Sequence, residues 1–209
     1  MKNLRFLFIA LFACGGLLAQ NITLPAPQKT GGMPLLEALA RRATSRAFDA
    51  ARELSPQQLS NLLWATFGIN RPDGRRTAPS ARNLQELDVY VLLKSGVFVY
   101  AAKNHELIQL AAEDCRALGG SQPFVKDAPV TLVFVADLAK TGGGASAGSK
   151  DWVNIDTGYL SQNAYLYCAS EGLATGARAL VDKAALGPKL KLRPDQVIVL
   201  AQSVGYPKA

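Results

Sequence analysis

Two arginines and two hydroxyl side chains lie within five consecutive residues of the stretch 42–48. The guanidinium groups of Arg42 and Arg46 donate planar pairs of hydrogen bonds that match phosphate oxygens, and the hydroxyl of Thr44 can complete such a site. An arginine pair on a short segment is equally consistent with a solvated surface, so this cluster alone leaves both interpretations open. As a binding site, it would favour a phosphorylated ligand.

The composition limits what that ligand can be. The chain has 209 residues and a formal net charge of +7, which is enough length for one domain with a substantial core. Its basic residues are scattered and form neither a run nor a helix stripe, so we expect an anionic small molecule and no nucleic acid. The motifs of the dinucleotide-binding and P-loop folds are also missing.

Residues 1–20 have the pattern of an export signal. Lys2 and Arg5 precede an apolar run that is too short to span a bilayer, and small residues follow it. Cleavage near Ala19 would release an exported, periplasmic protein. The alternative is a lipobox-like pattern around Cys14, which would anchor the protein to the membrane by lipidation. We favour the first route.

The remaining reactive side chains suggest no hydrolytic chemistry. His105 is the only histidine, and we expect it at the start of a helix as a surface or capping residue. No nucleophile motif accompanies it. Cys115 and Cys168 lie in helical patterns without metal-ligand spacing, and we interpret both as buried apolar residues, although an oxidising compartment would permit a bridge between them.

The order of elements predicts an α+β domain over 33–209, preceded by an extended tether over 21–32. Ser55, Pro56 and Gln58 form the start signal of a helix that ends at Gly68. The predicted helices cover 34–43, 56–67, 104–118 and 156–172, the predicted strands cover 89–93, 97–100, 130–136 and 197–204, and 142–148 is predicted to be a flexible loop.

Four segments in this order resemble the FMN-dependent nitroreductase family, most closely its SagB-type branch of thiazoline- and oxazoline-oxidising dehydrogenases. The similar segments are Arg42-x-Thr44-x-Arg46-x-Phe48, the helix from Gln58 to Arg71, the loop Arg76-Thr77-Ala78-Pro79-Ser80-Ala81, and Asp156-x-Gly158 continuing to Thr175. Together they cover nearly the whole chain after the export signal.

The resemblance implies a three-layer fold with a mainly antiparallel sheet, a long dimer-core helix, and a homodimer with two FMN sites shared between subunits. Arg42 and Thr44 would bind the flavin phosphate, with Ala43 between them as a further cofactor-binding residue. Arg46 would lie near the pyrimidine end, where a cation stabilises the charge of reduced flavin. The other implied cofactor residues are Pro79, Ser80, Ala81 and Asn83 from the partner subunit, and the backbone of Arg178, Ala179 and Leu180 near flavin N5 and O4.

The same resemblance implies an oxidoreductase without a protein nucleophile or metal, because the flavin supplies the redox chemistry. Two departures bear on this expectation: only Lys208 is available as a cation near the C-terminus, and no long helical insertion covers the substrate pocket. They keep open an alternative, a flavin-binding or electron-carrier module without turnover. The electron donor would be NAD(P)H or a quinol, and export favours the quinol or the substrate itself.

Overall fold

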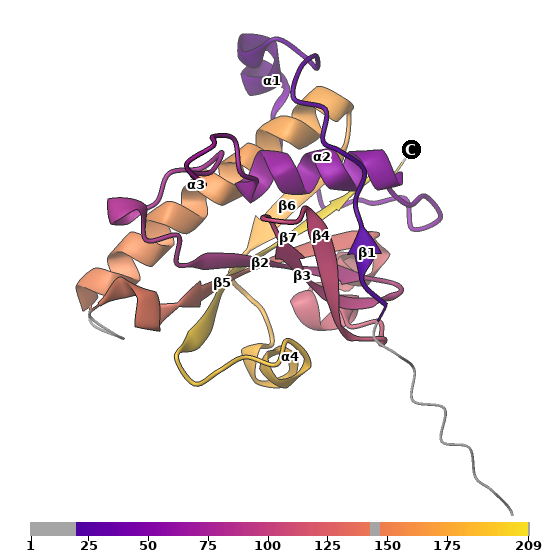
Figure 1. Ribbon diagram of the computed structural model, residues 1–209. Helices are drawn as coiled ribbons and strands as arrows, with labels where there is room; N and C mark the ends of the chain where they lie inside the picture. Colours follow the sequence, from indigo (N-terminus) through magenta and orange to yellow (C-terminus); the bar gives the residue numbers. More distant parts are fainter. Residues whose placement is uncertain (1–19, 143–146, 209) are drawn as a thin grey trace, which may run out of the picture.

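A single antiparallel sheet forms the centre of the protein (Figure 1). The computed structural model describes residues 20–142 and 147–208, and in these residues the strand order is β1-β4-β3-β2-β5-β7-β6, with every neighbouring pair antiparallel. The strands are β1 Ile22–Thr23, β2 Leu87–Leu93, β3 Gly96–Ala101, β4 Glu106–Ala111, β5 Val130–Asp137, β6 Ala174–Arg178 and β7 Gln196–Gly205.

Helices cover both faces of this sheet, which confirms the predicted α+β, three-layer architecture. On one face, α2 and α3 pack on the larger core with strand residues such as Val89 and Phe134, and on the other face α4 packs on a smaller core through Leu186. Helix α1 contacts α3 and projects from the body (Figure 1). The helices are α1 Leu35–Arg41, α2 Pro56–Phe67, α3 Ala147–Glu171 and α4 Lys183–Lys189, with short 3-10 turns η1 Ala81–Asn83, η2 Arg116–Gly119, η3 Pro123–Asp127 and η4 Leu138–Thr141.

Helix α2 begins and ends as its sequence predicts. The side chain of Ser55 accepts from the backbone N–H of Gln58, and the Gln58 side chain accepts from the N–H of Ser55, which is a complete capping box. Pro56 occupies the first turn, where its missing N–H has no consequence. The N–H of Gly68 then closes the last turn on Trp64.

The central strands also agree with their apolar patterns. All eight residues of β5 are buried, as expected for a strand covered on both faces. The predicted hairpin forms between β2 and β3 around Ser95, with Leu93 opposite Gly96. Helix α3 packs against strands β6 and β7, and it ends just before β6 begins.

The predicted helix over 104–118 is wrong. Residues 106–111 form β4 instead, with Leu107 fully buried opposite Tyr100 on β3, and only 116–119 form a 3-10 turn. A tight turn brings the chain back so that Ala101 pairs with Glu106, and His105 in this turn has a φ of 52°. Residues 106–111 form so short a segment that their apolar pattern fits either a helix or a strand, and pairing with β3 makes them a strand.

The tether over 21–32 is extended, but part of it packs on the domain. Ile22 and Thr23 pair with β4, and Leu24 is buried in the main core. Within the predicted loop 142–148, residues 143–146 lie outside the described residues, and α3 already begins at Ala147 instead of Asp156. Residues 1–19, with the predicted export signal, also lie outside the described part.

Two further observations concern the apolar character of the chain. Cys115 and Cys168 are both free and buried, which confirms their interpretation as apolar residues, although Cys115 precedes a 3-10 turn and does not lie in an α-helix. No helix in 20–142 or 147–208 combines the length and the hydropathy needed to cross a membrane.

Candidate cofactor site

The segment 42–48 lies along β6, the edge strand of the sheet. The N–H of Ser45 donates to the carbonyl of Thr175 at 2.8 Å. A Cβ atom on Gly176 would lie 2.7 Å from the carbonyl oxygen of Ser45, so a side chain at 176 would push the segment away. The glycine therefore permits the close approach that places the two arginines at this edge.

Tyr165 of α3 links this segment to the strand. Its hydroxyl lies 3.0 Å from Oγ1 of Thr44 and accepts from the N–H of Ala177 at 2.9 Å. Because that oxygen accepts from Ala177, its own proton is available for Thr44. The guanidinium of Arg42 lies 5.4 Å from the centre of the Tyr165 ring, within the range of a cation–π contact.

Neither Arg42 nor Arg46 forms an ion pair with any carboxylate of the described residues. The adjacent Arg41 differs, since it pairs with Glu37 one turn earlier on α1. Two guanidinium groups beside an exposed threonine hydroxyl, without a protein anion, have the donors that a phosphate requires. The donor set at this edge therefore fits the predicted phosphate-binding role of Arg42 and Thr44.

The C-terminal segment runs beside the same stretch. Phe48 forms a β-bridge with Pro207, and the N–H of Lys208 donates to the carbonyl of Ala47. The ring of Phe48 is buried, 6.0 Å from that of Phe124. This contact anchors the end of the arginine segment and places the backbone of Lys208 next to it.

The loop 79–83 contacts a different part of α3. The N–H of Ala81 donates to Oδ2 of Asp156 at 2.7 Å, and the side-chain amide of Asn163 donates to the carbonyl of Thr77 at 3.4 Å. Arg82 and Asn83 both have a φ of 55°, which is uncommon for residues with a Cβ. The tertiary contacts of the loop maintain this unusual conformation.

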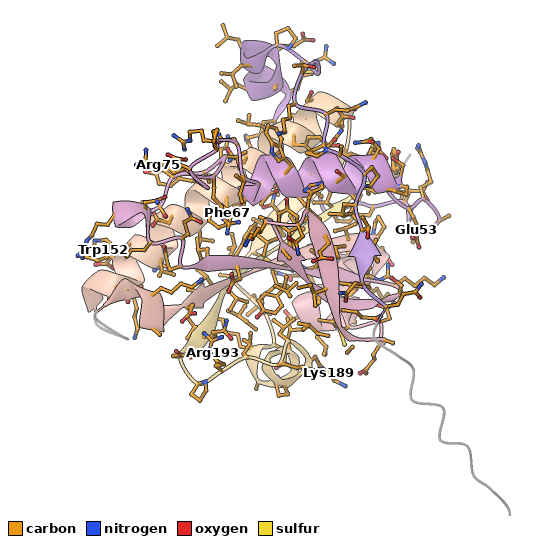
Figure 2. All side chains as sticks on the ribbon, in the orientation of Figure 1. Glu53, Phe67, Arg75, Trp152, Lys189 and Arg193 are labelled. Carbon is orange, nitrogen blue, oxygen red and sulfur yellow. The ribbon has the colours of Figure 1, made fainter. Side chains whose placement is uncertain are left out.

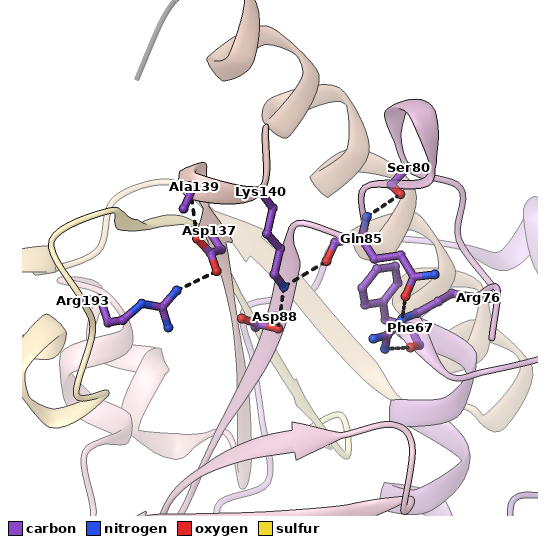
Figure 3. A network of polar contacts seen from close by, with 9 residues as sticks. All are labelled: Phe67, Arg76, Ser80, Gln85, Asp88, Asp137, Ala139, Lys140 and Arg193. Atoms are coloured by element: carbon purple, nitrogen blue, oxygen red, sulfur yellow. Dashed lines mark hydrogen bonds and ion pairs between the residues drawn. The ribbon is translucent and has the colours of Figure 1, made fainter. Parts of the chain in front are cut away.

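A network of polar contacts fixes the end of this loop (Figure 3). Oγ of Ser80 accepts from the N–H of Gln85, and the Gln85 side chain accepts from Nε of Arg76 at 2.9 Å. Arg76 also donates to the carbonyl of Phe67 and lies 4.4 Å from the centre of its ring. Lys140 donates to the carbonyl of Gln85, which ties the loop to the end of β5.

A cavity of about 330 Å³ opens beside the same loop. Its lining includes Arg82, Leu84, Lys140 and Trp152, and the Arg82 guanidinium lies 5.9 Å from the Trp152 ring. The surface beside the loop 79–83 is therefore basic and partly aromatic.

The stretch 178–180 shows two different environments. Ala179 and Leu180 are exposed at the surface. Arg178 is buried, and its guanidinium donates to the carbonyl of Gly119 and to Oγ of Ser203. Burial lowers the pKa of Arg178 to about 10, which still leaves it cationic at neutral pH. No carboxylate of the described residues pairs with this buried cation.

The two parts of the predicted site lie on opposite sides of α3. Asp156 and Tyr165 are nine positions apart, so their side chains point in roughly opposite directions and are separated by about 13 Å along the axis. One chain therefore does not bring the arginine segment and the loop 79–83 together.

The surface of α3 between these two sides carries large apolar residues. Trp152, Ile155 and Tyr159 are 37%, 56% and 46% exposed, and their spacing places them on one face. Figure 2 shows Trp152 at the outer edge of the protein, pointing away from the body. Leu35, Leu36 and Leu39 of α1 are exposed as well. Such a set of exposed apolar residues is typical of a protein–protein contact.

The sequence did not identify every side chain that shapes the site. Asp156 was part of a recognised motif, but its contact with Ala81 was not predicted, and neither Tyr165 nor Glu86 carried a sequence signal. Both interact with residues that are distant along the chain.

The expectation for His105 is wrong. The residue lies in the β3–β4 turn, half-buried, with Nε2 2.7 Å from Oγ of Ser60 and Nδ1 2.8 Å from the hydroxyl of Tyr100. Ser60 is fully buried, so this arrangement presents no nucleophile to a substrate. In the part of the chain that the structure describes, no three His, Cys, Asp or Glu side chains gather as metal ligands.

Comparison with known proteins gives the same fold. A Ralstonia eutropha JMP134 protein assigned to the nitroreductases is 37% identical, with a TM-score of 0.85 over 93% of this chain and 96% of that one. The NADPH:FMN oxidoreductase from Vibrio harveyi, solved with NAD+, is 19% identical, with a TM-score of 0.62 over 84% of this chain and 69% of that one. At that identity the second likeness supports the fold alone.

Sequence comparison extends this likeness to the archaea. A Methanocaldococcus jannaschii protein assigned to the nitroreductases is 28% identical over 151 residues, which is 68% of this chain and 76% of that protein. The profile of the nitroreductase family matches residues 39–206, from the end of α1 to the residue after β7. Since this match includes the arginine segment, the loop 79–83 and α3, the chain belongs to the nitroreductase family, whose members are typically flavin-dependent oxidoreductases.

Proposed function

We propose that the protein is an FMN-dependent oxidoreductase that transfers hydride or electrons to or from a small organic substrate. The observation that carries this proposal is the pair Arg42 and Arg46, which lies beside Thr44 at the edge of β6 without a carboxylate partner in the described residues. Bound FMN would supply hydride chemistry at its N5 atom.

The residues of the chain would bind and orient the cofactor. Arg42, Ala43 and Thr44 would hold the phosphate, with the Thr44 hydroxyl oriented by Tyr165. Arg46 would lie near the pyrimidine end, where a cation favours the reduced, negatively charged form. The backbone of the exposed residues Ala179 and Leu180 would donate to the other edge of the ring system.

The proposed assembly is a homodimer with shared sites. Pro79, Ser80, Ala81 and Asn83 would contact the flavin of the partner subunit, since α3 separates them from the arginine segment of their own chain. The exposed apolar face of α3 supports this assembly, because pairing would remove Ile155 and Tyr159 from water.

Three finer assignments also belong to this proposal. The motifs favour the SagB-type branch, so oxidation of a small substrate stands beside reduction of nitro or quinone acceptors. The pattern of residues 1–20 favours export to the periplasm, with membrane attachment through Cys14 as the alternative. An exported enzyme would use a quinol or its own substrate as the electron source more readily than NAD(P)H.

The test is the visible spectrum of the protein, purified with added FMN and then mixed without oxygen with NADH, NADPH and a reduced quinone. We expect bound flavin that one of these donors, or an organic substrate, bleaches. Flavin that no donor or substrate reduces would favour a binding or carrier module. A protein without affinity for flavin would overturn the proposal.

A further inference from the structure

Two carboxyl groups are buried together beneath the loop 79–83. Glu86 precedes β2 and is 1% exposed, and Asp156 lies on α3 and is 3% exposed. Buried carboxyl groups normally have a cation or several hydrogen-bond donors as partners. This pair is unusual because each acid has another carboxyl group as a neighbour.

No other residue in 20–142 or 147–208 donates a hydrogen bond to either carboxyl oxygen of Glu86, and its own backbone N–H lies close enough to lower its pKa. The neighbouring carboxyl of Asp156 raises the pKa of Glu86, both as a side-chain hydrogen-bond partner and through its charge. Two ionised carboxylates offer each other only acceptors, so a bond between them requires a proton on one. No other residue donates to Glu86, whereas Asp156 accepts from the backbone N–H of Ala81, and burial raises the pKa of Glu86 more than its own backbone N–H lowers it, so the proton belongs on Glu86.

Asp156 connects this pair to the loop. Its Oδ2 accepts from the N–H of Ala81 at 2.7 Å, at the start of η1. Arg82, Asn83 and Gln85 follow with φ values of 55°, 55° and 47°. A loop in this conformation depends on its tertiary contacts, and the carboxylate of Asp156 is one of them.

The other charged groups near Glu86 already have partners. Lys140 on η4 donates to the carbonyl of Gln85 and lies 3.9 Å from Asp88 on β2. Asp137 on β5 donates its backbone N–H to the Glu86 carbonyl, while its carboxylate pairs with Arg193 (Figure 3). Among the described residues, Lys140 is therefore the only cation that acts on the Glu86 carboxyl, and it does so without a hydrogen bond.

We propose that Glu86 and Asp156 share one proton, and that this proton positions the loop 79–83 for cofactor binding. Protonated Glu86 donates to Asp156, and Asp156 holds the N–H of Ala81. When Glu86 loses the proton, two buried carboxylates repel each other and the anchor of the loop weakens. Glu86 is thus a positioning residue that makes the loop respond to pH.

The electrostatics place this response near neutrality. Burial is the main cause that raises the pKa of Glu86 to about 7. The neighbouring Asp156 acts in the same direction, whereas the backbone N–H of Glu86 and the charge of Lys140 act against it. Because the folded value exceeds the unfolded one, the stabilisation is complete at low pH and is lost as the pH rises through about 7. The loop should therefore be most ordered in mildly acidic solution.

The first test measures the loop without any cofactor, by hydrogen exchange of residues 79–85 at pH 6 and pH 8, corrected for intrinsic exchange rates. We expect protection to fall about tenfold, because the protonated fraction of an acid with a pKa near 7 falls about tenfold over this interval. Unchanged protection between these pH values would overturn the proposal.

Two substitutions distinguish the shared proton from a general effect of pH. Glu86→Gln is neutral and can still donate to Asp156, so its loop protection should be the same at both pH values. Asp156→Asn can still accept from Ala81 and also donates to ionised Glu86, so its loop should remain protected at pH 8. The control Glu106→Gln changes a half-exposed acid on β4 and should behave as the unmodified protein. A Glu86→Gln variant with the pH dependence of the unmodified protein would refute the shared proton.

A second measurement concerns the cofactor and rests on the proposed function. The Kd for FMN should rise between pH 6 and pH 8 in the unmodified protein and remain constant in Glu86→Gln. If the loop responds to pH and no flavin binds, the proposed function fails and the proton-sharing pair stands. If flavin binds and its Kd keeps the same pH dependence in Glu86→Gln, the role of this pair in cofactor binding is refuted.

Discussion

The hydroxyl of Tyr165 lies 3.0 Å from the hydroxyl of Thr44, and it also accepts from the backbone N–H of Ala177. One side chain of α3 thus joins the arginine segment to the edge strand. The position of Thr44 depends on a contact 121 residues away along the chain.

Replacing Tyr165 by Phe tests this link. The change removes both hydrogen bonds and leaves the N–H of Ala177 without its acceptor, so the free energy of unfolding should fall by about 1–2 kcal/mol. The Kd for FMN should rise about threefold to tenfold, because Thr44 loses its orientation. Isothermal titration with FMN and urea unfolding measure the two effects.

Tyr167→Phe is the matched control for that change. Tyr167 lies on the same helix, but its hydroxyl donates to the carbonyl of Gln58 on α2, away from the arginine segment. This variant should lose a similar amount of stability and keep its affinity for FMN. Equal loss of FMN affinity in both variants would mean that Tyr165 acts through general stability alone.

Arg42→Ala combined with Arg46→Ala should abolish FMN retention while the fold stays intact. Each substitution removes a charge-assisted partner worth about 1.5–3 kcal/mol in binding. Neither arginine has an ion pair within the described residues whose loss would affect folding. Absorbance of the purified protein reports flavin occupancy, and circular dichroism reports the fold.

Arg41→Ala provides the comparison for the arginine pair. Arg41 is adjacent to Arg42 but pairs with Glu37 on α1, so its loss should leave flavin occupancy unchanged. If the double variant retained its flavin, the phosphate would have to bind elsewhere on the protein.

The exposed face of α3 predicts the effect of a charge on assembly. Ile155→Glu should convert the proposed dimer into monomers and weaken flavin binding, because Ile155 is 56% exposed in one chain and would be buried in the pair. Light scattering after size-exclusion chromatography measures the mass. Ile108→Glu places the same charge on β4, outside this face, and should remain dimeric. A dimeric Ile155→Glu protein would exclude this face as the contact.

Local signals predicted parts of the fold well, and tertiary contacts determined the rest. The capping box of α2 involves residues three apart, so the sequence contains the whole interaction. Residues 106–111 became a strand because β3 lies beside them, which no local pattern states. In the site, the sequence predicted the arginine motif because its phosphate-binding side chains lie close together in the sequence. The carboxyl pair of Glu86 and Asp156 forms only when α3 packs against β2.

A series of hydrogen bonds through His105 predicts how acid affects the N-terminal segment. Oγ of Ser60 donates to the carbonyl of Pro25 at 2.6 Å, so it accepts from Nε2 of His105, and Nδ1 accepts from Tyr100.

These hydrogen bonds require neutral His105, so acid should disrupt them. Burial is the main cause that lowers the pKa of His105, so the stabilisation is present above the unfolded pKa of about 6.5 and is lost as the pH falls. His105→Asn suits the φ of 52° and removes the titration, at a cost of about 1–3 kcal/mol at pH 7. Urea unfolding at pH 7 and pH 5 should show a smaller loss of stability on acidification in this variant than in the unmodified protein. Proteolysis of residues 20–33 should increase at pH 5 in the unmodified protein only. Equal losses in the two proteins would show that His105 does not contribute to the acid response.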